Sequence, residues 1–146
     1  MPAQQIEISA YRLYLASREL DYTDEQRTVL DVIGQSHLSY AQALSGFLGR
    51  EASNDADEAL VAERLGAFTA DVDSALQAAY DLESALVSTH ILTIGALRGT
   101  DAVNLLASIV TVEGRNGTVL ADLMGESDFA VLLVDNEADP IETAKG

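Results

Sequence analysis

Four side chains that could bind a metal ion interrupt the apolar faces of predicted helices: Glu7, His37, Glu83 and Glu113. Glu7 adjoins an apolar stripe, and the other three lie on stripes themselves. Burying a carboxylate is costly unless a partner compensates its charge, so repulsion among three buried carboxylates would either favour their protonated forms or require a cation between them. Carboxylate and imidazole groups are ligands for divalent metals. These positions therefore predict a metal site at the centre of a helical bundle.

Each candidate ligand belongs to a different long helix. The helices are predicted at about residues 4–20, 24–48, 71–97 and 101–124. Thr23, followed three residues later by Gln26, predicts a capping box at the start of the second helix. A preliminary helical stretch over 57–68 precedes the third helix, and the pattern leaves open whether the two are separate.

The connections between these helices predict their arrangement. The first and third connections are short, whereas residues 50–58 form a longer acidic connection in the middle. This pattern predicts two antiparallel hairpins packed as a four-helix bundle over residues 1–125. The acidic tail, 126–146, contains an apolar stretch at 129–134 and is expected to be partly docked or flexible, with residues 137–146 loose.

Composition supports an all-α fold. The chain has 146 residues, 48% of them hydrophobic, which suits one domain with its own core. The prolines number only two, Pro2 and Pro140, and both lie near the ends. A long interior without proline favours long helices over a many-stranded sandwich.

Charge and cysteine content exclude several function classes. The chain has 24 acidic and 8 basic residues, a net charge of −16, which repels phosphate backbones and anionic lipid surfaces. The absence of cysteine excludes disulfides, thiolate nucleophiles and cysteine-bound zinc. The N-terminal stretch lacks the features of a signal peptide, and no apolar run is long enough to span a bilayer. We therefore expect a soluble, cytoplasmic protein that binds neither nucleic acid nor membranes.

Two segments carry a resemblance to a known family. "IEISAYRLYLASREL" places Tyr14 seven residues after Glu7, and "DLESALVSTH" places His90 seven residues after Glu83. With these motifs the chain resembles the ferritin-like superfamily, which includes bacterioferritin and rubrerythrin, over residues 4–124. The resemblance implies a ferritin-like four-helix bundle with a di-iron carboxylate site. In that family helices one and three each supply a Glu, and helices two and four each supply a Glu-x-x-His motif.

The motifs on the second and fourth helices depart from this pattern. The second reads Gly34-Gln35-Ser36-His37 and lacks the Glu, and the fourth reads Glu113-Gly114-Arg115-Asn116 and lacks the His. The resemblance thus implies a degenerate site of Glu7, His37, Glu83 and Glu113, with Asn116 as a weak fifth ligand. Such a set suits one iron or similar divalent ion, and two only with a bridging water or anion.

Two functions follow from the resemblance. The first is iron binding for ferrous oxidation, peroxide handling or iron storage; any enzyme activity would be that of a ferroxidase-like oxidoreductase. The alternative is a structural or interaction bundle that has lost metal binding. In either case we expect a homodimer or a higher homo-oligomer.

Other residues near the predicted site have two interpretations. His90 is two helical turns from Glu83, so it is expected in a different layer, as a hydrogen-bonded core histidine. Tyr14 either supports a ligand carboxylate through a hydrogen bond or packs in the core. Gly34, Gly114 and Gly117 indicate either tight helix–helix contacts, the plainer interpretation, or a small cavity.

Overall fold

The structure is a computed structural model and describes residues 2–142. Within that range all regular secondary structure is helical, which confirms the all-α prediction. The chain divides into two compact units, residues 1–78 and 79–146, and the boundary lies inside one long helix. None of the helices in the described range combines the length and apolar character that crossing a bilayer requires.

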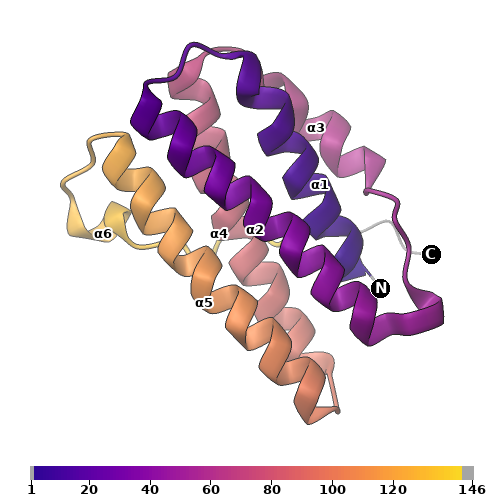
Figure 1. Cartoon of the computed structure of the whole chain (residues 1–146). Helices are drawn as coiled ribbons and strands as arrows, with labels where there is room; N and C mark the ends of the chain where they lie inside the picture. The colour runs from indigo at the N-terminus through magenta and orange to yellow at the C-terminus, as the bar shows by residue number, and fades with distance from the viewer. Residues whose placement is uncertain (1, 143–146) are drawn as a thin grey trace. The chain divides into compact units, whose positions relative to one another are not determined.

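The first unit is built on an antiparallel helical hairpin. Helix α1 (Pro2–Ala16) is connected to α2 (Asp24–Leu48) by a short segment that includes the 3-10 turn Ser17–Glu19, and the two helices lie side by side (Figure 1). Helix α3 (Glu58–Phe68) also contacts α1. The core contains apolar residues of α1 and α2, among them Ile6, Ala10, Leu13, Leu30, Ile33, Ala41 and Leu44.

Helix α2 begins and ends where local sequence signals predict. The backbone N–H of Gln26 donates to Thr23 Oγ1 (3.2 Å), and the Thr23 N–H donates to Gln26 Oε1 (3.0 Å), so the capping box is confirmed. At the other end Gly49 has φ +57°, a conformation that glycine adopts at little cost. Local sequence signals therefore determine where α2, the helix that carries the buried His37, begins and ends.

The preliminary helix and the third long helix are separate. Helix α3 ends at Phe68, and α4 (Val72–Ala96) begins after three intervening residues. Asp71 lies at this start, where its side chain accepts hydrogen bonds from the Ser74 N–H (2.8 Å) and hydroxyl (2.9 Å). These bonds, chiefly the backbone one, lower the pKa of Asp71, and the carboxylate satisfies a backbone donor that has no partner within the helix.

The second unit contains most of α4, together with α5 (Thr100–Leu123) and α6 (Phe129–Leu132), which contacts α5. The chain beyond α6 is docked as far as Ile141, which is buried and whose N–H donates to Thr89 Oγ1 (2.8 Å). The expectation that residues 137–146 are loose is therefore wrong at Ile141. The part of that expectation concerning residues 143–146 lies outside the described residues.

Candidate metal centre

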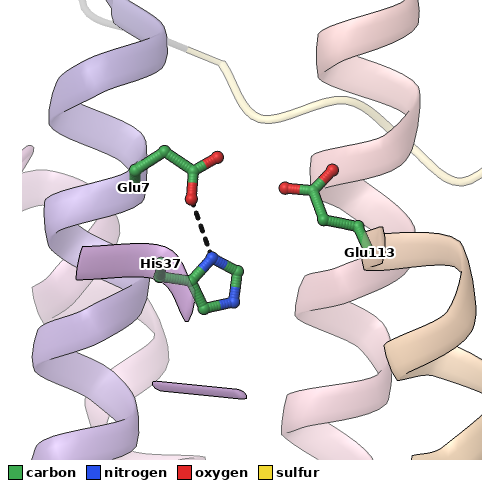
Figure 2. Close-up of side chains that lie close together, drawn as sticks. All are labelled: Glu7, His37 and Glu113. Carbon is green, nitrogen blue, oxygen red and sulfur yellow. Dashed lines mark hydrogen bonds and ion pairs between the residues drawn. The ribbon is translucent and has the colours of Figure 1, made fainter. Parts of the chain in front are cut away.

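In the first unit, Glu7 on α1 and His37 on α2 form a buried pair. Both have 0% exposure, and His37 Nδ1 lies 2.7 Å from Glu7 Oε2 (Figure 2). An ionised carboxylate only accepts hydrogen bonds, so the imidazole donates through Nδ1. A carboxylate that holds one ring nitrogen in this way is the usual support for a metal-binding histidine, because it sets the orientation of the ring.

Aromatic rings hold the imidazole of His37 from two directions. The ring of Tyr14 stacks on it, with centroids 5.4 Å apart and planes 21° apart, and Tyr40 meets it edge-on at 6.0 Å. Phe68 in turn packs edge-on against Tyr14 at 5.6 Å. Rotation of the imidazole would disrupt these contacts, so its position is fixed before any ligand binds.

Gly34 explains how Tyr14 reaches this position. A Cβ atom at Gly34 would lie 3.0 Å from Tyr14 Cβ, tighter than ordinary contact, so α1 and α2 approach closely here. This confirms the tight helix–helix contact predicted for Gly34. It also gives the physical consequence of the missing motif glutamate, because any side chain at this position would have to displace Tyr14.

In the second unit, two hydrogen bonds join α4 to α5 at buried candidate ligands. Asn116 Nδ2 donates to Glu83 Oε2 (3.1 Å), and His90 Nδ1 lies 3.0 Å from Glu113 Oε2. The exposure of Asn116 is 9%, and that of the other three residues is 0%. Each glutamate is thus positioned by a polar side chain from the neighbouring helix.

The Glu83–Asn116 pair corresponds to the Glu7–His37 pair of the first unit. The partners are 33 residues apart in this pair and 30 residues apart in the Glu7–His37 pair. Asn116, expected as a weak fifth ligand, uses its amide as a donor to Glu83. Asn116 therefore supports Glu83 in the second unit as the imidazole of His37 supports Glu7 in the first.

His90 is the functional contact that sequence reasoning missed. We expected a hydrogen-bonded core histidine in a different layer from Glu83; the hydrogen bond is confirmed, and its partner is Glu113, another of the predicted ligands. Along an antiparallel pair of helices, later residues of one face earlier residues of the other. The Glu83–Asn116 pairing therefore brings His90 toward residues that precede Asn116.

All four predicted ligands are buried, as their places on or beside apolar stripes predicted. The structure pairs Glu7 with His37 in the first unit, and it places Glu83 and Glu113 in separate pairs in the second. Glu7, His37 and Glu113 each offer a ligand atom of a kind that could hold a metal ion (Figure 2). Oxygen and imidazole donors fit iron, manganese, cobalt or zinc, so the donor set agrees with a divalent ion.

The comparisons with known proteins point to a family. A family model described as a ferritin-like domain matches residues 3–126, which includes every candidate ligand and ends before the docked C-terminal segment. No curated protein and no solved structure matches the chain.

Proposed function

Because the chain belongs to the ferritin-like family, we propose that it binds a divalent metal ion, with iron as the first candidate, through Glu7, His37, Glu83 and Glu113. The proposal requires that the two units present their buried acids to the same ion. The observation that carries it is the fully buried Glu7–His37 pair, whose hydrogen bond and aromatic contacts prepare an imidazole for a metal.

The electrostatic cost of the buried acids supports a cation. Glu7, Glu83 and Glu113 have no exposed surface, and isolated buried carboxylates are among the most unfavourable groups in a protein interior. Hydrogen bonds from imidazole and amide groups offset part of this cost. A divalent ion would neutralise two of the charges and would explain why the helices retain acids on their inner faces.

We propose one ion per chain. In the family the second motif supplies a glutamate, but here the position is Gly34, where even a Cβ would crowd Tyr14. The fourth motif supplies a histidine, but here Asn116 is engaged as a donor to Glu83. The remaining three carboxylates and one imidazole offer enough oxygen and nitrogen donors for a single divalent ion.

A bound iron would supply the one-electron redox change that ferrous oxidation, peroxide handling or iron storage requires. The chain's own residues would hold and orient it. His37 is fixed by Glu7 and Tyr14, and His90 orients the Glu113 carboxylate through its ring nitrogen. Burial of these groups excludes bulk water and strengthens their electrostatic interactions.

Anaerobic titration with ferrous iron, followed by elemental analysis, tests metal binding. The wild type is expected to retain about one iron per chain, and Glu113→Gln to lose it, because the substitution keeps the side-chain shape but removes the charge. Glu63→Gln is the matched control, since Glu63 is an exposed acid on α3. Metal-free wild-type protein under saturating iron would contradict the proposal.

A second candidate function is a structural or interaction bundle without metal. It is favoured by the Asn116 amide, which supports Glu83 with a neutral donor where the family has a metal-binding histidine. In this case the double variant Glu83→Gln with Glu113→Gln would be at least as stable as the wild type, and iron would not change either melting temperature. Stabilisation by iron in the wild type alone would exclude this candidate.

We also propose that the protein acts as a homodimer or higher homo-oligomer in the cytoplasm. Val32 and Phe47 support a subunit interface, because these apolar side chains of α2 are 62% and 52% exposed. Light scattering after size-exclusion chromatography tests this. A monomeric mass at micromolar concentration would contradict it.

A further inference from the structure

The segment from Leu133 to Ile141, called the strap from here on, is held by a row of hydroxyl groups on α4. Each hydroxyl bonds a main-chain atom, so these three bonds depend on the backbone of the strap and not on its side chains. The bonds are Tyr80 Oη to Leu133 O (2.8 Å), Asp135 N to Ser84 Oγ (3.2 Å), and Ile141 N to Thr89 Oγ1 (2.8 Å). The strap therefore follows α4 over more than two helical turns.

An apolar anchor on α5 adds to these bonds. Val134 lies against Gly117, where an added Cβ would be only 2.9 Å from Val134 Cβ and 3.0 Å from its Cγ2. The close approach predicted for Gly117 thus exists, but its partner is the strap and not another helix. Gly114, one turn earlier, is less tight, because a Cβ there would lie 3.7 Å from Val134 Cγ1.

The residues that anchor the strap lie next to the Glu83–Asn116 pair of the candidate metal centre. Ser84 directly follows Glu83 on α4, and Gly117 directly follows Asn116 on α5. The strap consequently crosses both helices at the level of the Glu83–Asn116 hydrogen bond. We propose that the strap is a lid on this pair, and that its release controls the access of water and metal ions to Glu83.

The strap is built to open more easily than the helices unfold. Three of its nine residues are acidic and none is basic, and Leu133 is 56% exposed. The Tyr80 hydroxyl, which bonds the first residue of the strap, lies near several negative charges. Burial is the main cause that raises its pKa, and the charges of Asp135, Asp81 and Glu126 raise it further. Repulsion between these carboxylates opposes docking, so salt is expected to favour the closed state.

Gly117→Ala tests the lid, with Gly114→Ala as its matched control. Both substitutions add one methyl group to α5, and both raise helix propensity equally. Only the methyl group at position 117 collides with Val134, so only that variant is expected to loosen the strap. Hydrogen exchange measured by NMR reports two events separately: the Asp135 and Ile141 amides report strap docking, and the Asn116 side-chain amide reports access to the pair.

In Gly117→Ala, exchange at the Asp135 and Ile141 amides and at the Asn116 side chain is expected to accelerate together, by about tenfold or more, at unchanged helix content. Gly114→Ala is expected to exchange like the wild type. Faster exchange of the strap amides with unchanged exchange at Asn116 would overturn the lid. Unchanged strap amides in Gly117→Ala would overturn the docking itself.

The control of metal entry rests on the proposed function and needs its own readout. Cobalt(II) is the probe, and its association rate by stopped-flow absorbance is expected to rise several-fold in Gly117→Ala. An unchanged rate would refute the control of entry. If the wild type binds no cobalt or iron, the proposed function fails, while exchange at Asn116 still decides whether the strap covers the pair.

Discussion

The Glu7–His37 pair allows a quantitative test in the metal-free protein. Replacing His37 by leucine removes a buried hydrogen bond of 2.7 Å to a carboxylate and the stacking contact with Tyr14. A hydrogen bond to a charged group contributes about 1.5–3 kcal/mol, and an aromatic contact about 0.5–1.5 kcal/mol. The variant also leaves Glu7 buried without its imidazole partner, so we expect a total loss of about 3–5 kcal/mol.

The double variant Glu7→Leu with His37→Leu removes both members of the pair, so it shows how much of the loss in His37→Leu comes from leaving the carboxylate without its partner. Replacing both members of a buried pair by apolar groups of similar size is often neutral or stabilising. We therefore expect the double variant to be more stable than His37→Leu alone and to lie within about 1–2 kcal/mol of the wild type. It is also expected to bind no iron.

Urea unfolding followed by circular dichroism, with a chelator present, measures these differences. Arg18→Gln is the control, because the Arg18–Asp31 pair has a similar distance of 2.8 Å but lies on the surface, and its loss is expected to cost less than about 1 kcal/mol. A double variant that is less stable than His37→Leu would refute the reasoning, since the carboxylate would then be stable without its partner.

Three further predictions concern other parts of the chain. Asn116→His would copy the Glu7–His37 pair in the second unit, and calorimetry is expected to show metal affinity rising by about tenfold or more; an unchanged affinity would count against a ligand role at that position. The pKa of Tyr80 is raised, mainly by burial and further by neighbouring carboxylates. The neutral hydroxyl therefore stabilises the folded state fully below about pH 10, the pKa of an unfolded tyrosine. This contribution is lost as the pH rises through the folded-state pKa. Unfolding measured from pH 8 to 11 is therefore expected to show a steeper alkaline loss in the wild type than in Tyr80→Phe, and parallel curves would refute it. Thr23→Ala removes the capping box of α2 and is expected to lower the free energy of unfolding by about 1 kcal/mol, measured by heat or urea. An unchanged free energy of unfolding would show that the cap is dispensable.

Sequence alone predicted the features that local chemistry determines. The start of α2 follows from Thr23 and Gln26, which bond each other across one turn. The burial of Glu83 and Glu113 follows from their places on apolar stripes. The burial of His37 likewise follows from its place on an apolar stripe.

The features that sequence reasoning missed depend on contacts between distant segments. The bond between His90 and Glu113 depends on the register of two antiparallel helices, which helical periodicity along one chain does not contain. The docking of the strap depends on hydroxyl groups that bind main-chain atoms, and such contacts leave little signature in the strap's own sequence. Gly117 pointed to a close approach but not to Val134 as its partner.

Anomalous X-ray scattering from crystals soaked in ferrous iron tests the shared metal site most directly. We predict one strong iron peak per chain, with Glu7, His37 and Glu113 within about 2.0–2.5 Å of it and Glu83 facing the same ion. A peak found only among exposed acids, or Glu113 turned away from the Glu7–His37 pair, would contradict a metal centre formed by these helices.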